Sequence, residues 1–84
     1  MAKVVIYTTQ VCPYCVRAKQ LLQNKGVQYT EIRVDDNAEL RAELVAKTGR
    51  RTVPQIFIND QPIGGCDDLY ALESAGKLDS LLAE

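Results

Sequence analysis

The chain has 84 residues, of which 46% are hydrophobic and 25% are charged, and this composition is typical of a folded domain. Its formal net charge is −1, so the sequence lacks the positive charge expected of a protein that binds nucleic acid or an anionic membrane. No apolar run approaches the roughly 20 residues that cross a bilayer, and Met1-Ala2-Lys3 does not resemble the start of a signal peptide. We therefore expect one cytoplasmic domain over residues 1–84, acting as a monomer without nucleic-acid or membrane partners.

The cysteines restrict the chemistry that this chain can perform. Cys12 and Cys15 are separated by two residues, Cys66 is distant, and the chain has no histidine. A tetrahedral zinc site needs four ligands, usually two cysteine pairs or cysteine with histidine, so we predict no metal site. Without histidine, a Cys–His or Ser–His nucleophile pair is also excluded. In the cytosol a close cysteine pair is more often catalytic or metal-binding than structural, and without a metal site redox chemistry becomes the first hypothesis.

The hydrophobic pattern changes from strand to helix just before this cysteine pair. Residues 4–7 form a short apolar run, and apolar residues after Cys12 then recur at helical spacing. Pro13 suits a first helical turn, and Gly26 suits the position after a helix, so we predict a helix over residues 13–25. Cys12 would then lie at the helix N-terminus. Unpaired backbone N–H groups and the helix dipole favour the thiolate there, and the thiolate is the form that attacks disulfides.

The rest of the chain continues an alternation of strands and helices. We predict a strand at 29–34, a helix between cap candidates 35–37 and Gly49, strands at 55–58 and 61–63, a helix from Asp67 or Asp68 to about Gly76, and a turn at 79–82. The order β-α-β-α-β-β-α implies one parallel crossover followed by an antiparallel hairpin. A Cys-x-x-Cys after the first strand of such a pattern indicates an α/β, thioredoxin-like fold with a four-stranded mixed sheet flanked by helices.

Two further segments have both a structural and a functional interpretation. In Thr52-Val53-Pro54, the proline is explained by its tolerance at the start of a strand. Alternatively, a cis peptide between Val53 and Pro54 turns the Val53 backbone outward, where an extended substrate can pair with it. Tyr14, between the cysteines, is either an ordinary surface aromatic or part of a substrate groove.

The segment 64–68, Gly-Gly-Cys-Asp-Asp, also has both a structural and a functional interpretation. It is explained by a turn followed by a helix cap, or by a carboxylate site at a helix N-terminus. An acidic side chain at that site would bind an ammonium group, so a ligand with both groups on one carbon, as in an amino acid, would fit. Cys66 is either a small packing residue or a reactive third thiol.

Three motifs together resemble a known family. Cys-Pro-Tyr-Cys at 12–15, Thr-Val-Pro-Gln-Ile-Phe-Ile at 52–58 and Gly-Gly-Cys-Asp-Asp-Leu at 64–69 resemble the small bacterial dithiol glutaredoxins over nearly the whole chain. The resemblance implies a thioredoxin-like fold with Val53–Pro54 in cis. It also implies a glutathione-dependent oxidoreductase that reduces protein disulfides and glutathione mixed disulfides. Glutathione would be the reducing co-substrate, with no tightly bound cofactor, and disulfide-containing or glutathionylated proteins would be the partners.

The same resemblance implies roles for individual residues. Cys12 would be the nucleophile and Cys15 the resolving thiol. The residues implied to bind glutathione are Tyr14, Arg41, Arg51, Thr52, Val53, Pro54, Asp67 and Asp68. Among these, the backbone N–H groups of Asp67 and Asp68 would bind the γ-glutamyl carboxylate and the Asp68 side chain its ammonium. Thr9 departs from the family, because many glutaredoxins carry a lysine there that contacts the glycyl carboxylate, and Arg41 and Arg51 would compensate for it.

Two rival functions are set against this interpretation. A glutaredoxin-like redoxin reduced by thioredoxin reductase shares the first motif but generally lacks the Gly-Gly-x-Asp-Asp site. A non-enzymatic iron–sulfur carrier usually has glycine after the first cysteine and serine in place of the second. Pro13 and Cys15 argue against the carrier, and residues 64–68 argue against the redoxin.

Overall fold

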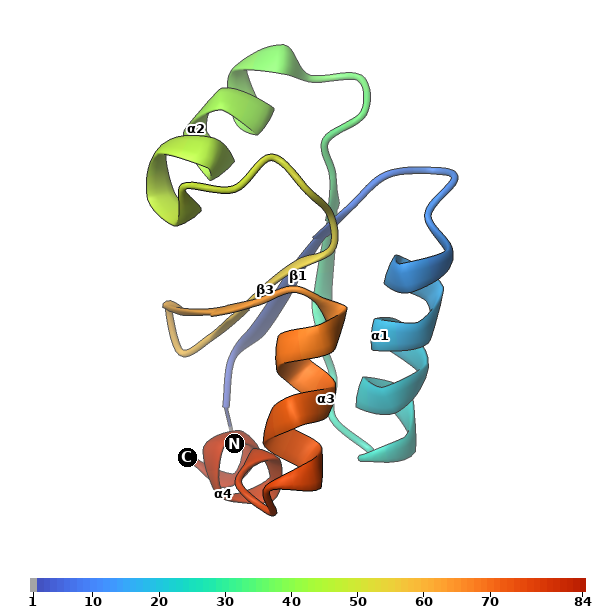
Figure 1. Ribbon diagram of the computed structural model, residues 1–84, viewed down its shortest axis with the longest axis vertical. Helices are drawn as coiled ribbons and strands as arrows, with labels where there is room; N and C mark the ends of the chain where they lie inside the picture. The colour runs from blue at the N-terminus through green and yellow to red at the C-terminus, as the bar shows by residue number, and fades with distance from the viewer. Residues whose placement is uncertain (1) are drawn as a thin grey trace.

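A computed structural model describes residues 2–84, which fold around one four-stranded sheet (Figure 1). The strands are β1 (Val4–Thr8), β2 (Thr30–Arg33), β3 (Gln55–Ile58) and β4 (Gln61–Gly64). The helices are α1 (Pro13–Asn24), α2 (Ala38–Thr48), α3 (Cys66–Ser74) and α4 (Leu78–Ala83). The strand order is β2-β1-β3-β4, with β1 parallel to β2 and the other neighbours antiparallel. The predicted mixed sheet flanked by helices is confirmed.

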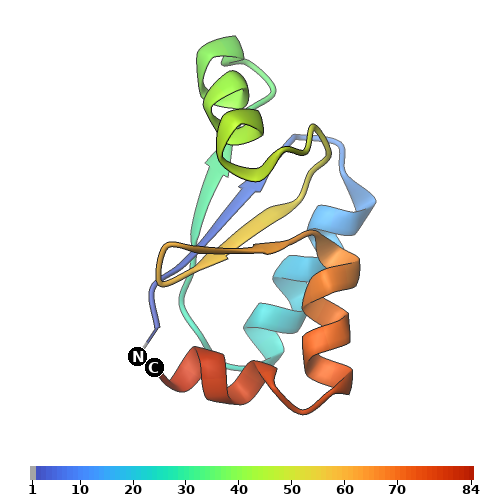
Figure 2. The same cartoon turned by 60° about the vertical axis from the view of Figure 1, so that its left-hand side comes forward.

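The helices divide between the two faces of the sheet. Figures 1 and 2 show α1 and α3 side by side on one face, and α2 on the other side near one end of the strands. In the register of the central pair, Ile6 lies opposite Ile56, and both are fully buried. Since the C-terminal end of β1 leads into α1 and the N-terminal end of β3 lies beside it, the cysteine motif and the loop before β3 meet at one end of the sheet.

The hydrophobic core lies between the sheet and α1, α3 and α4. Leu22 from α1, Leu69 from α3 and Leu78 from α4 are each 0% exposed and belong to one buried cluster with the isoleucines of β1 and β3. Full burial of such a side chain contributes about 1.5–3 kcal/mol each. This core holds α1 and α3 against the sheet and therefore sets how their N-terminal ends face each other. Among the described residues 2–84, no helix has both the length and the apolar character that spanning a membrane requires.

The C-terminal segment differs from the prediction. Residues 79–82 were predicted as a turn, but they belong to α4, so that prediction is wrong. Leu78 and Leu82 lie one helical turn apart and are both buried in the core, at 0% and 6% exposure. A helix of this length is marginal alone, so its apolar contacts with the rest of the protein stabilise it.

Candidate active site

The cysteine pair lies at the start of α1, as the hydrophobic pattern predicts. Cys12 is the N-cap residue, with extended backbone at φ −152° and ψ 94°, and its Sγ accepts a hydrogen bond of 3.1 Å from the Cys15 N–H. Cys12 and Cys15 form a disulfide with their Cα atoms 5.1 Å apart. Cys15 is 1% exposed whereas Cys12 is half-buried. The two cysteines therefore differ, since Cys12 is partly exposed to solvent and Cys15 is not.

The loop before β3 lies against Cys12. The Cys12 Sγ is 3.8 Å from the Val53 carbonyl oxygen, and the Val53–Pro54 peptide bond is cis, which confirms that prediction. Gln55, at 1% exposure, donates a hydrogen bond of 2.9 Å from Nε2 to the Thr52 carbonyl oxygen. A buried side-chain amide therefore holds the backbone of this loop in place beside Cys12.

The N-terminus of α3 forms the opposite wall of the site. Asp67 and Asp68 were predicted as cap candidates, but the N-cap residue is Gly65, so that prediction is wrong. Asp68 lies at the third helical position, and its Oδ2 accepts a 2.9 Å hydrogen bond from the Gly65 N–H. The carboxylate thus caps the helix from inside its first turn. A Cβ at Gly65 would lie 3.4 Å from the Pro54 carbonyl oxygen, so the N-cap of α3 lies close to the loop before β3.

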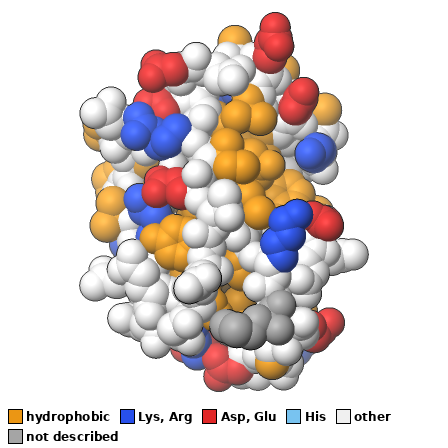
Figure 3. Space-filling model, turned by 180° about the vertical axis from the view of Figure 1, so that it is seen from behind, with side chains coloured by type: hydrophobic (Ala, Val, Ile, Leu, Met, Phe, Trp, Pro, Cys, Tyr) orange, Lys and Arg blue, Asp and Glu red, His pale blue; other side chains and the backbone are white. Residues whose placement is uncertain are grey.

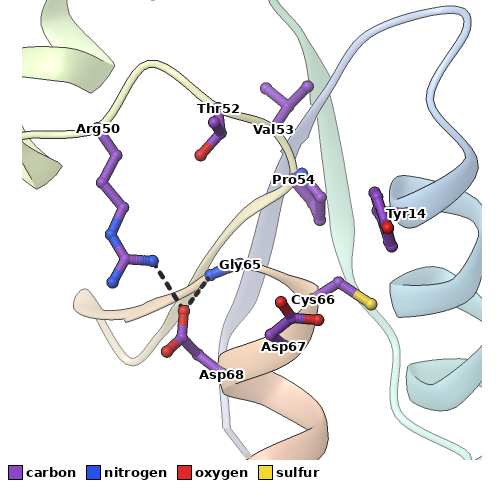
Figure 4. A pocket seen from close by; sticks show the side chains of 9 residues that line it. All are labelled: Tyr14, Arg50, Thr52, Val53, Pro54, Gly65, Cys66, Asp67 and Asp68. Carbon is purple, nitrogen blue, oxygen red and sulfur yellow. Dashed lines mark hydrogen bonds and ion pairs between the residues drawn. The ribbon is translucent and has the colours of Figure 1, made fainter.

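These three segments enclose a pocket of about 260 Å³, shown in Figure 4. Its lining residues are Tyr14, Arg50, Thr52, Val53, Pro54, Gly65, Cys66, Asp67 and Asp68. Six of the eight residues implied to bind glutathione are therefore brought together, although they come from three separate parts of the chain. Tyr14 is 56% exposed at the rim of the pocket. The half-buried Cys12 lies two residues before it in the sequence.

Arg41 and Arg51 lie elsewhere. They line a different depression over α2, where the Arg41 guanidinium donates a 2.9 Å hydrogen bond to the Arg51 carbonyl oxygen. The structure therefore does not bring these two residues to the pocket beside the cysteines.

Arg50 is the pocket residue that the sequence analysis missed. Its Nη1 lies 2.8 Å from Asp68 Oδ2, and this ion pair crosses from the loop before β3 to α3 (Figure 4). The Arg50 guanidinium, followed by the Gly65 N–H, lowers the pKa of the Asp68 carboxyl, which keeps it ionised. Nothing in the sequence distinguishes Arg50 from the adjacent Arg51, because the local backbone decides which of the two side chains points to the pocket.

Cys66, the third cysteine, is 5% exposed and lies at the first position of α3. Burial raises the pKa of its thiol, so it has less thiolate character than an exposed cysteine. Its position and its raised pKa favour the packing interpretation over that of a reactive thiol.

The arrangement suits exchange between thiols and disulfides. A helix N-terminus stabilises negative charge on Cys12, and a buried cysteine lies within bonding distance behind it. Beside this pair is a pocket with a cation, two carboxylates and the N-terminal end of α3, where free backbone N–H groups attract anions. Such a pocket can hold a small ligand that carries both positive and negative groups while its sulfur faces Cys12.

Comparison with known proteins agrees with this geometry. The family model described as Glutaredoxin matches residues 4–63. The chain is 65% identical over 83 residues to a glutaredoxin of Pseudomonas aeruginosa, covering 99% of both chains. It is 60% identical over 82 residues to glutaredoxin 3 of Escherichia coli strain K12, covering 98% of this chain and 99% of that one.

Solved structures give the same result. The crystal structure of the buckwheat glutaredoxin–glutathione complex superposes on this fold with a TM-score of 0.91 at 35% identity, covering 98% of this chain and 77% of that chain. Sequence, fold and the dithiol at the helix N-terminus thus agree, and the chain belongs to the glutaredoxin family of glutathione-dependent thiol–disulfide oxidoreductases.

Proposed function

We propose that Cys12 is the attacking thiolate and Cys15 the resolving thiol of this thiol–disulfide oxidoreductase. The observation that carries the proposal is the N-cap geometry of Cys12. Its sulfur accepts the Cys15 N–H at the positive end of α1 and stays accessible, while the Cys15 sulfur is buried behind it. The positive end of the helix, which favours a thiolate, therefore lies at the more accessible of the two cysteines.

With a glutathione mixed disulfide, one cysteine is enough. The Cys12 thiolate attacks the glutathione sulfur, forms a Cys12–glutathione disulfide and releases the client thiolate, which takes a proton from water. A second glutathione thiolate then attacks this intermediate. Glutathione disulfide leaves, and the Cys12 thiolate is restored.

With a protein disulfide, both cysteines take part. Cys12 forms a mixed disulfide with one client sulfur, and the other client sulfur leaves as a thiolate. Cys15, once deprotonated, attacks Cys12, so the client is released fully reduced and the Cys12–Cys15 disulfide forms. Two glutathione molecules then reduce that disulfide and become glutathione disulfide.

The glutathione site in this proposal is the pocket between α1, the loop before β3 and α3. The buckwheat glutaredoxin was crystallised as a complex with glutathione, which supports the assignment. Tyr14 would flank the tripeptide, the Val53 backbone would pair with its cysteinyl residue, and Thr52 and Pro54 would shape the groove. The N-terminus of α3 would bind the γ-glutamyl carboxylate and Asp68 its ammonium.

The wider organisation follows from the same proposal. Residues 1–84 would form a single domain, supported by one core that includes side chains from β1 and β3 and from three of the four helices, α1, α3 and α4. It would act as a cytoplasmic monomer on glutathionylated and disulfide-containing proteins.

Serine variants of the two cysteines test these roles. We expect Cys12→Ser to abolish both activities, because a serine oxygen cannot form the mixed disulfide through which both reactions pass. Serine is also a favoured N-cap residue, so the variant should keep the fold. Cys15→Ser should keep substantial activity on a glutathionylated peptide and lose activity on a protein disulfide. Initial rates coupled to glutathione reductase measure both substrates.

Circular dichroism of each variant provides the folding control. Wild-type turnover by Cys12→Ser would exclude Cys12 as the nucleophile. Loss of peptide deglutathionylation in a folded Cys15→Ser variant would show that resolution by Cys15 is needed for both reactions. Faster reduction of the disulfide form by thioredoxin reductase than by glutathione would favour the redoxin alternative.

A further inference from the structure

The Arg50–Asp68 pair places two opposite charges in contact within the lining of the pocket. Of the residues lining the pocket, all of them within the described part of the chain, Arg50 is the one cation, and it pairs with the Asp68 carboxylate, while Asp67 adds a second carboxylate to the lining. Both side chains of the pair are accessible, at 51% for Arg50 and 42% for Asp68. A ligand can therefore reach either charge.

The hydrogen bonds leave part of each group available. The Arg50 Nη1 and the Gly65 N–H both donate to the same oxygen of Asp68, Oδ2, at 2.8 and 2.9 Å, and Figure 4 shows the other oxygen directed away from both donors. A guanidinium has five N–H donors in a planar fork, so one bond to Asp68 leaves others for a second acceptor. The pair thus offers a carboxylate oxygen and guanidinium N–H groups side by side.

We propose that Arg50 determines specificity for the α-amino-acid end of the substrate. The inference rests on the proposed glutathione site. The γ-glutamyl ammonium binds Asp68, and the carboxylate on the same carbon binds Arg50 as well as the N-terminus of α3. The ammonium and the carboxylate of the γ-glutamyl residue are attached to one carbon atom. They therefore match the adjacent, opposite charges of Asp68 and Arg50.

The charges of the pocket explain why Arg50 would matter for binding. Without it, the lining side chains carry two carboxylates and no cation, and such a pocket repels a substrate with a net negative charge. Arg50 offsets one of these charges and also donates to the ligand carboxylate, an interaction between charged groups that is stronger than a neutral hydrogen bond. Since the site is half-exposed, the effect should be moderate and should weaken as salt is added.

The first test compares Arg50→Gln with the wild type on a glutathionylated peptide. We expect KM to rise roughly 10-fold, because one charge-assisted hydrogen bond to the substrate is lost. The value of kcat should stay within about twofold of the wild-type value. The increase in KM should shrink in 0.5 M salt. Arg50→Lys keeps the charge and should recover most of the loss. Lys47→Gln removes one positive charge from an exposed side chain of α2 outside this pocket and should change KM less than about twofold.

The second test asks which carboxylate Arg50 contacts. Two substrate analogues are used, one with the γ-glutamyl α-carboxylate converted to an amide and one with the glycyl carboxylate converted to an amide. We expect the effect of Arg50→Gln on KM to disappear with the first analogue and to persist with the second. A residue that only maintains the pocket shape would raise KM equally for all three substrates.

The outcomes separate the inference from the function on which it rests. Unchanged KM in Arg50→Gln, an equal increase for all substrates, or an increase that disappears only with the glycyl amide would each overturn the role of Arg50 while the wild type still turns over. Absence of turnover by the wild type would overturn the proposed function and this inference together.

Discussion

Gly64, at the end of β4, shows how a single residue shapes the pocket. Its φ is +116°, a region that residues with a Cβ rarely adopt. A Cβ at this position would lie 2.7 Å from Cγ and 2.9 Å from Cβ of Asp68. The absence of a side chain at Gly64 therefore leaves the space in which the Asp68 carboxylate reaches the Gly65 N–H.

We predict that Gly64→Ala impairs both stability and substrate binding. The left-handed backbone costs roughly 1–2 kcal/mol, and the contact with Asp68 adds to it, so Tm should fall by about 10 °C or more. KM should rise because Asp68 is displaced. Gly76→Ala is the matched control, since Gly76 has φ +72° but nothing within 4 Å of its added Cβ. Equal losses of Tm and unchanged KM in both variants would contradict this role.

Among the elements, α2 connects to the site through its C-terminal end. Thr48 Oγ1 donates a 2.8 Å hydrogen bond to the Leu44 carbonyl oxygen, and it accepts one of 3.1 Å from the Arg50 N–H. Between them, Gly49 ends the helix with φ +72°. The turn that follows α2 thus sets the direction in which Arg50 leaves the backbone.

We predict that the stability of α2 depends on its cap. Leu44 is its one buried side chain, whereas the Asn37 side chain accepts a 3.0 Å hydrogen bond from the Leu40 N–H. Asn37→Ala should lower the free energy of unfolding by about 1 kcal/mol, and Asn37→Asp should keep it, because aspartate is an equally good cap. Urea denaturation followed by circular dichroism measures both. A loss of the same size in Asn37→Asp would exclude the cap as the cause.

At the scale of the whole molecule, hydrogen-bonded carboxylates link the elements and make stability depend on pH. Glu31 on β2 accepts a 2.6 Å hydrogen bond from the fully buried Thr8 of β1 and lies 3.1 Å from Lys19 Nζ of α1. The Thr8 hydroxyl, followed by Lys19, lowers the pKa of Glu31. A hydrogen bond from the Arg33 side chain lowers the pKa of Asp35, and a hydrogen bond from the Arg50 side chain lowers the pKa of Asp68.

We predict that the protein loses stability in acid below about pH 4, near the pKa of an unfolded carboxyl. A carboxyl whose pKa is lower in the folded state stabilises the fold above its unfolded pKa, and this contribution is lost as pH falls through the folded pKa. Urea unfolding between pH 7 and pH 3 measures the loss. Glu31→Gln should be less stable at pH 7 and should show a shallower decline, whereas a parallel decline would show that Glu31 does not contribute.

Much of the fold and part of the site follow from local sequence. The change of hydrophobic period around Cys12, with Pro13 after it, predicts a thiol at a helix N-terminus because both signals act within a few residues. The strand at 55–58 and the turn at Asn59-Asp60 are likewise local and lie where predicted. The C-terminal helix was missed because its stability comes from Leu78 and Leu82 in the distant core.

The amino-acid sequence alone predicts the dithiol, the order of the elements up to α3 and, through the resemblance of three motifs, the family. Which charges meet at the pocket depends on the tertiary structure. Three arginines precede Val53 within twelve residues, and Arg50 alone reaches Asp68, whereas Arg41 and Arg51 lie together beside α2. The turn after α2 sets the directions in which the arginine side chains leave the backbone. Asp68 belongs to α3, and α3 is positioned by core contacts with residues far away in the sequence.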